Sequence, residues 1–116
     1  MIKIKRVFEK PSSDDGYRVL VDRLWPRGIS RKEAAIDLWL REVAPSNDLR
    51  KWFGHVPEKW TEFQKKYEQE LDQNESVTKK IKEILHRETV VTLVYAAKDE
   101  LHNQAVVIRK YFSQSV

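Results

Sequence analysis

Apolar and polar residues alternate at the start of the chain, which is the period-two pattern of a β-strand. Over residues 2–8, isoleucines alternate with lysines, as expected for an edge strand with one solvated face. Turn-forming residues fill positions 11–16, and a second strand is predicted over residues 17–24, ending before Pro26 and Gly28. Because residues 11–16 are too few for the crossover that joins parallel strands, we predict that these two strands run antiparallel.

A third strand is predicted over residues 89–97, which are apolar or β-branched almost throughout. Such a run is typical of a central strand covered on both faces. The chain between the second and third strands is long and helical in pattern, which allows those two strands to pair in parallel. The pattern therefore predicts a mixed sheet of about three strands with a parallel central pair.

Apolar residues at spacings of three and four predict about five helices around this sheet. The first is predicted to start after Ser30, which has capping-box spacing with Glu33, and to run as far as Pro45. The others are predicted over residues 46–53, from Pro57 to about residue 71, from Ser76 to about residue 87, and from about residue 100 to Phe112. In the last of these, Leu101 is among the residues expected to pack against the sheet. Residues 1–116 are thus predicted to form a single α/β domain of two or three layers.

Composition and charge exclude several classes of function. The 22 lysines and arginines exceed the 18 aspartates and glutamates by 22 − 18 = 4. This excess suits an anionic partner but is small for a dedicated nucleic-acid binder. The absence of cysteine excludes disulfides, thiolate catalysis and cysteine-based metal sites, and it suits a reducing compartment. With no apolar run of membrane-spanning length and no signal-peptide pattern at the N-terminus, we expect a cytoplasmic protein that does not contact membranes.

Several familiar catalytic and cofactor motifs are absent from the sequence. None of the three glycines belongs to a Gly-x-Gly-x-x-Gly or Walker-type loop. The three histidines are scattered without the spacing of a zinc site, and no Gly-x-Ser-x-Gly elbow is present. We therefore expect no nucleotide cofactor, no metal site and no Ser-His-Asp catalysis.

Polar residues gather directly after the two strands that are predicted to be parallel. Because the carboxyl ends of parallel strands share one edge, where open α/β sheets bind ligands, these residues are predicted to face a common pocket. Arg23, Arg27 and Lys98 are the expected clamps for a phosphate or carboxylate, and Asp22 and His102 are the candidate acid and base. The remaining candidate ligand-binding residues are Trp25, His55, Tyr95, Asp99 and Asn103.

Several candidates also have a structural explanation. Asp22 and Arg23 can form an ion pair at a strand end, and Asp99 can cap the last helix. Trp25 can act as a hydrophobic plug, and His102 can hydrogen-bond a neighbouring loop. The sequence leaves both kinds of role open.

Three motifs resemble the YeaO-like family, a group of small bacterial and archaeal proteins of unknown function. They are Val21 to Gly28, Lys51 to His55 and Leu93 to Asn103, and the resemblance spans nearly the whole chain. It implies that the segment around His55 joins the two polar loops in one pocket. Longer members of the wider group carry cysteine in the third-strand segment, in a pattern similar to rhodanese or phosphatase loops. Here Tyr95 and Ala96 stand in that segment, so the resemblance implies anion binding without thiol chemistry.

Two functions remain open at this stage. The first is a small anion-binding domain, either a binding protein or an enzyme acting on a phosphorylated or carboxylated metabolite or nucleotide. The second is a non-catalytic module that binds a protein or nucleic acid through a basic edge. A small anionic ligand should stabilise the first kind of protein and leave the second unchanged.

Overall fold

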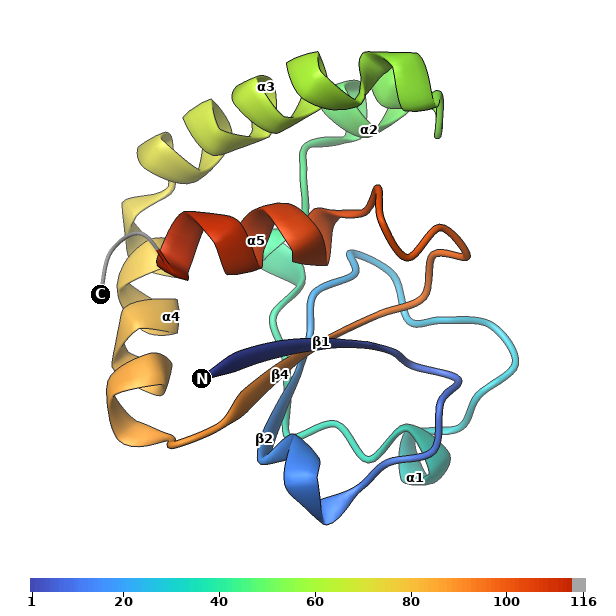
Figure 1. The fold of residues 1–116 in the computed structure, drawn as a ribbon, viewed down its shortest axis with the longest axis vertical. Coiled ribbons are helices and arrows are strands. Elements are labelled where there is room, and N and C mark those ends of the chain that lie inside the picture. Colours follow the sequence, from blue (N-terminus) through green and yellow to red (C-terminus); the bar gives the residue numbers. More distant parts are fainter. Residues whose placement is uncertain (114–116) are drawn as a thin grey trace.

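The computed structural model describes residues 1–113 and contains a parallel sheet at its centre (Figure 1). In that part of the chain the sheet has four strands in the order β1, β4, β2, β3. The strands are β1 (Ile2–Arg6), β2 (Tyr17–Leu20), β3 (Leu38–Trp39) and β4 (Val91–Tyr95). The predicted α/β fold class is confirmed, although every strand pairing is parallel and the sheet is therefore not mixed.

The parallel pairing of the two strands that precede the polar loops is also confirmed. β2 pairs with β4 so that Tyr17 lies opposite Val91 and Leu20 lies opposite Val94. The loops that leave these two strands lie on the same side of the molecule, at the right of Figure 1. Residues more than 70 positions apart in the sequence therefore meet at one edge of the sheet.

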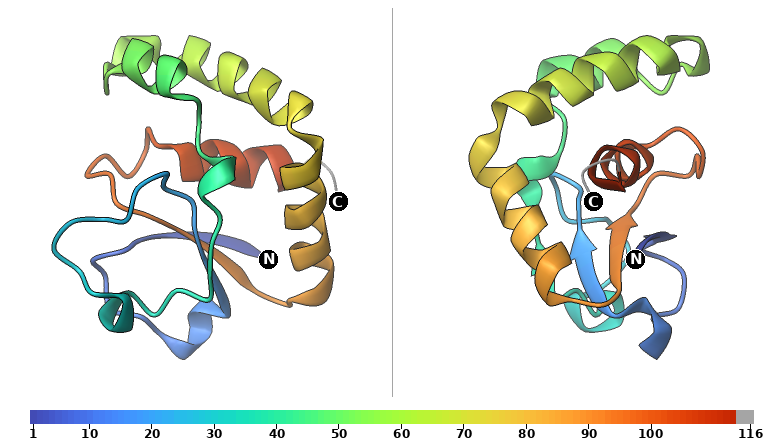
Figure 2. Two further views of the ribbon diagram at one scale, coloured as in Figure 1. Left: turned by 180° about the vertical axis from the view of Figure 1, so that it is seen from behind. Right: turned by 60° about the vertical axis from the view of Figure 1, so that its left-hand side comes forward.

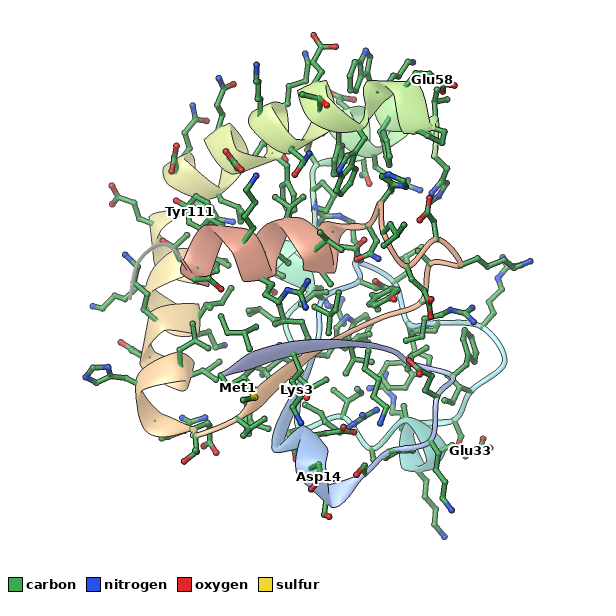
Figure 3. The ribbon with its side chains drawn as sticks, in the orientation of Figure 1. Met1, Lys3, Asp14, Glu33, Glu58 and Tyr111 are labelled. Carbon is green, nitrogen blue, oxygen red and sulfur yellow. The ribbon has the colours of Figure 1, made fainter. Side chains whose placement is uncertain are left out.

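The predicted antiparallel arrangement of β1 and β2 is wrong, because β4 lies between them and runs parallel to both. The connection from β1 to β2 crosses over β4 and uses all of residues 7–16, not only the turn-forming residues 11–16. Hydrogen bonds hold it against the sheet. Thr92 Oγ1 donates to the carbonyl of Asp15 at 2.6 Å. Lys3 Nζ donates to the carbonyl of Asp14 at 3.0 Å, and Figure 3 labels both of these residues. A short segment that contains a turn and the 3-10 helix η1 (Ser13–Asp15) thus makes a crossover without an α-helix.

Five α-helices and three short 3-10 helices accompany the sheet within residues 1–113. The α-helices are α1 (Arg31–Ala34), α2 (Asn47–Phe53), α3 (Trp60–Gln73), α4 (Glu75–Arg87) and α5 (Gln104–Ser113). The 3-10 helices are η1 (Ser13–Asp15), η2 (Arg41–Val43) and η3 (Pro57–Lys59). None of these helices is both long enough and apolar enough to cross a bilayer.

The predicted helix from Ser30 to Pro45 forms only at its start. The capping box between Ser30 and Glu33 is present, but Ala35 adopts a left-handed conformation with φ of 50° and ends α1 after one turn. The chain then pairs with β2 as β3, where Asp37 exchanges hydrogen bonds with the backbone of Arg18. The apolar spacing that indicated a helix is therefore satisfied by a short strand followed by η2.

Two later helices begin at different residues from those predicted. Ser76 lies inside α4, whose N-cap is Asn74. The last helix begins at Gln104 rather than near residue 100, because the preceding residues form a turn. Leu101, which was predicted to pack against the sheet, lies in that turn and is 72% exposed.

The sheet lies between a thick helical layer and a thin layer of loops (Figure 2). Alternate residues of β4 divide between them: Val91, Leu93 and Tyr95 face the core formed with the helices, whereas Val94 faces a smaller cluster with Leu20. Helices α4 and α5 pack on the first face, and α3 lies on the far side of α5 from the sheet. The second face is covered by the segment that contains α1.

A buried ionic network braces the thin layer. Arg18 is 4% exposed, and its Nη1 lies 2.6 Å from Asp15 Oδ2. Lys5 Nζ lies 3.1 Å from the other carboxylate oxygen, Asp15 Oδ1. The other donors of Arg18 bind the carbonyls of Ala34 at 2.8 Å and Ala35 at 3.1 Å, at the end of α1. One guanidinium therefore joins β2, the β1–β2 crossover and α1.

Candidate functional site

A cleft opens at the carboxyl edge of the sheet, between the loops that follow β2 and β4 and the helical layer above them. Its walls come from residues 22–24, 44–55 and 96–104, together with Phe63 of α3. The volume is about 870 Å³, which lies within the range of roughly 300–1,000 Å³ typical of small-molecule sites. The cleft is therefore large enough for an organic ligand rather than only an inorganic ion.

Asp22 joins the two loops at the base of the cleft. One carboxylate oxygen accepts a hydrogen bond from the backbone nitrogen of Ala96 at 3.1 Å, and the other accepts one from Gln104 Nε2 at 2.5 Å. Burial raises the pKa of Asp22 to about 6, because the low-dielectric surroundings disfavour the charge more than the two hydrogen bonds favour it. Through these two hydrogen bonds, Asp22 holds the loop after β4 against the loop after β2.

Two further side chains hold that loop in place. Arg6, at the end of β1, donates from Nε to the carbonyl of Ala97 at 3.0 Å and from Nη2 to the carbonyl of Ala96 at 3.3 Å. Asn103 is buried and donates to the carbonyl of Asp99 at 2.9 Å, while its amide oxygen accepts from the backbone of Val106. Asn103 therefore has the capping role at α5 that the sequence assigned to Asp99.

Three cationic side chains line the cleft. Arg23 donates from Nη2 to the carbonyls of Ala44 and Pro45, both at 3.1 Å, which directs the guanidinium toward the helical layer rather than into an ion pair with Asp22. Its Nε is buried and has no hydrogen-bond partner among the described residues. Arg50 and Lys98 are exposed and form no ion pair within residues 1–113, so both charges remain available to an anion.

Asp99 and His102 form a hydrogen-bonded pair at the rim of the cleft. His102 Nδ1 lies 2.8 Å from Asp99 Oδ2, and Asp99 Oδ1 accepts from the backbone nitrogens of Leu101 and His102. The hydrogen bond from His102, followed by that from Leu101, lowers the pKa of Asp99. Because a carboxylate only accepts, His102 Nδ1 carries a proton and donates a hydrogen bond to Asp99.

The amino-acid sequence is similar to those of known bacterial proteins. A family model described as the inactive DUF488-N3 subclade matches residues 1–116. The uncharacterized protein YeaO of Escherichia coli (strain K12) is 41% identical over 107 residues, which cover 92% of both chains. The uncharacterized proteins Rv3073c of Mycobacterium tuberculosis (strain H37Rv) and Mb3100c of Mycobacterium bovis are each 38% identical over 107 residues, 92% of this chain and 89% of theirs. The chain belongs to this YeaO-like family. No solved structure matches it.

Seven of the ten candidate residues line the cleft in this member of the YeaO-like family. They are Asp22, Arg23, His55, Lys98, Asp99, His102 and Asn103. Trp25 and Arg27 are not among the lining residues: Trp25 donates from Nε1 to the carbonyl of Ile29 and contacts Trp39, and Arg27 is exposed. Tyr95 is 3% exposed and packs in the core under the helices. The candidates after β2 and β4 therefore lie at the shared edge of the sheet, but the side chains of Trp25, Arg27 and Tyr95 do not line the cleft.

Part of the cleft lining that comes from helices α2 and α3 was not predicted from the sequence. Arg50, Phe53 and Phe63 line the cleft, although their spacing on amphipathic helices indicated only a solvated face and a core. Gln104 was also missed, and it makes the hydrogen bond to Asp22. A helical pattern shows which face is buried but not which part of that face opens to a cleft.

The raised pKa of Asp22 predicts a dependence of stability on pH. Because the pKa is about 6 in the folded chain and 3.8 ordinarily, the ionised carboxylate opposes folding above pH 6, and this cost disappears as the pH falls toward 4. We expect Asp22→Asn to raise the free energy of unfolding by about 1–3 kcal/mol at pH 7.5. The gain should vanish near pH 4. Urea unfolding of the unchanged protein and of the variant from pH 4 to 8 measures the difference in free energy of unfolding. A difference that stays constant across that range would show that the raised pKa of Asp22 is not its cause.

Proposed function

We propose that this chain is a small anion-binding domain whose cleft takes up a phosphorylated or carboxylated organic molecule. The observation that carries the proposal is the convergence of Arg23, Arg50 and Lys98 on one cleft of ligand size. Arginine donors and a lysine charge are the groups that proteins use for phosphate and carboxylate. The buried Nε of Arg23 adds support, because it has no hydrogen-bond partner within residues 1–113 and an orphaned donor is costly.

The composition and the family description support binding rather than catalysis. The sequence has no cysteine, and the matching family model is described as inactive. The hydrogen-bonded pair of Asp99 and His102 is one acid–base group at the cleft, which Asp22 and His55 also line. In a binding protein, His102 Nε2 accepts a hydrogen bond from a ligand hydroxyl or protonated phosphate without transferring a proton.

A different surface supports binding to a macromolecule as the second candidate function. The guanidinium carbon of Arg31 lies 4.5 Å from the ring centre of Trp25, and that of Arg41 lies 3.9 Å from the ring centre of Trp39. Both arginines are exposed, and Arg27 is exposed in the same loop as Trp25. Arginines held over aromatic rings offer both charge and stacking surface to a nucleic acid.

The anion-binding proposal predicts that small anions stabilise the folded chain. We expect inorganic phosphate, a nucleoside monophosphate or a short carboxylic acid at 1–20 mM to raise Tm by several degrees, since a ligand at 100 times its Kd contributes about 2.7 kcal/mol. Lys98→Ala and Arg50→Ala should each remove most of that rise. Differential scanning fluorimetry at constant ionic strength provides the measurement.

Arg27→Ala is the matched control because it removes one exposed positive charge outside the cleft. It should leave the ligand-induced rise unchanged. If no anion raises Tm, or if Arg27→Ala and Lys98→Ala reduce the rise equally, the cleft is not an anion site. In that case, anisotropy of a labelled single-stranded oligonucleotide, with Arg31→Ala as the variant, tests the second candidate function.

A further inference from the structure

A cluster of five rings, here called the aromatic wall, lies where α2 and α3 meet the loop after β4 at the cleft. Its members are Phe53, His55, Trp60, Phe63 and His102. The ring centres of Phe53 and Phe63 are 4.4 Å apart and stacked, those of Phe53 and His55 are 6.1 Å apart, and those of Trp60 and His102 are 5.1 Å apart with an edge-on geometry. All members except Trp60 line the cleft. Phe53 and Phe63 are only 6% and 2% exposed, so His55 and His102 offer most of the ring surface that a ligand can reach.

The aromatic wall joins parts of the chain that are far apart in sequence. Phe53 ends α2, Trp60 and Phe63 belong to the first turn of α3, and His102 comes from the turn before α5. His55 follows Gly54, and both have positive φ, 58° for His55 and 52° for Gly54. This uncommon conformation for a residue other than glycine keeps the imidazole beside Phe53 at the cleft.

The size of the cleft suits a ligand with a body as well as a charge. A volume of about 870 Å³ far exceeds that of a phosphate or acetate ion. Besides the three cations, much of the lining is apolar, including Pro45, Phe53 and Phe63. At the opening, Leu24 also lines the cleft and is 75% exposed. Pro45, Phe53 and Phe63 are themselves buried, so Leu24 is the large apolar side chain that a bare anion would leave in water and that a ligand with an apolar body would cover.

From this arrangement we infer that the ligand of the cleft is an aromatic acid: a flat ring that packs against the aromatic wall and carries a phosphate or carboxylate held by Arg23, Arg50 or Lys98. The inference rests on the proposed function and deepens it by naming the class of ligand. Ring-to-ring packing favours an aromatic body over an aliphatic one of similar size, by about 2- to 10-fold in Kd. The same chemistry is offered by a nucleoside monophosphate and by a simple aryl acid.

Matched pairs of ligands test the inference and separate these two sources. Phenyl phosphate is compared with cyclohexyl phosphate, benzoate with cyclohexanecarboxylate, and adenosine monophosphate with ribose 5-phosphate, each by titration calorimetry. We expect the aromatic member of a pair to bind about 2- to 10-fold more tightly. A preference in the adenosine pair alone identifies a nucleotide site, and a preference in the phenyl and benzoate pairs identifies an aryl-acid site.

The three histidines of the chain provide a readout of position, because His55 and His102 lie in the aromatic wall and His86 lies on α4, away from the cleft. In carbon–proton correlation NMR spectra, an aromatic ligand should shift the imidazole signals of His55 and His102 through its ring current. Its aliphatic partner should produce smaller shifts, and the signal of His86 should not move. His55→Ala should reduce the preference for the aromatic member, and the control His86→Ala should leave it unchanged.

The outcomes separate this inference from the proposed function. Equal affinities within every pair, or histidine shifts of equal size from both members, would overturn the aromatic assignment and leave anion binding standing. A shift at His86 rather than at His55 and His102 would overturn the assigned position. Failure of all six compounds and of inorganic phosphate to bind would remove the proposed function itself.

Discussion

Arg18→Met is expected to lower the free energy of unfolding by about 3–5 kcal/mol, a large part of the roughly 5–15 kcal/mol that stabilises a typical domain. Methionine keeps the apolar length of the side chain but removes every donor. The buried carboxylate of Asp15 then loses a partner at 2.6 Å, and the carbonyls of Ala34 and Ala35 lose theirs. Lys5, at 3.1 Å, compensates Asp15 only in part. Urea unfolding followed by circular dichroism measures the loss as a lower midpoint.

Arg27→Met is the control for this experiment, since Arg27 is exposed and surface changes usually stay within about 0.5 kcal/mol. We expect its unfolding midpoint to match that of the unchanged chain. A loss of less than about 1 kcal/mol for Arg18→Met would show that the network contributes little to stability. The thin layer of the fold would then depend on its apolar cluster alone.

The network around Arg18 also shows why the sequence predicted the thin layer poorly. Period and capping correctly indicated a helix start at Ser30, but the end of α1 depends on Arg18, which lies 16 and 17 positions before the two carbonyls that it binds. The short strand β3 depends in the same way on its pairing with β2. Contacts of this kind are not visible in local periodicity, so the segment was read as one long helix.

The carboxyl edge was easier to predict because one inference, the parallel pairing of β2 and β4, determines which loops meet. The hydrogen bond from the backbone of Ala96 to Asp22 joins those loops as expected. The direction of each side chain is a separate question that sequence order does not answer. Tyr95 directly precedes the loop, yet as the last residue of β4 it points into the helical core, since successive strand residues alternate between the faces.

The β1–β2 crossover contains the residue for which we expect the second large effect. Gly16 has φ of 62° and ψ of −132°, a conformation that residues other than glycine rarely adopt. A Cβ at this position would lie 2.8 Å from the Cβ of Val90 and closer still to its carbonyl oxygen. That carbonyl accepts the hydrogen bond from Tyr17 that begins β2. A methyl group here would therefore push apart the first residues of the two central strands.

Gly16→Ala is accordingly expected to lower the free energy of unfolding by about 3 kcal/mol or more, through a backbone cost of about 1–2 kcal/mol plus steric overlap of similar size. Gly28→Ala is the matched control: Gly28 also has a positive φ, 84°, but a Cβ there would meet no atom within 4 Å. It should therefore show the backbone cost alone. Urea unfolding of both variants separates the two contributions. Equal losses in free energy of unfolding for the two variants would mean that Val90 moves away from the methyl group at little cost. The close approach of residue 16 to Val90 would then not be a requirement of the fold.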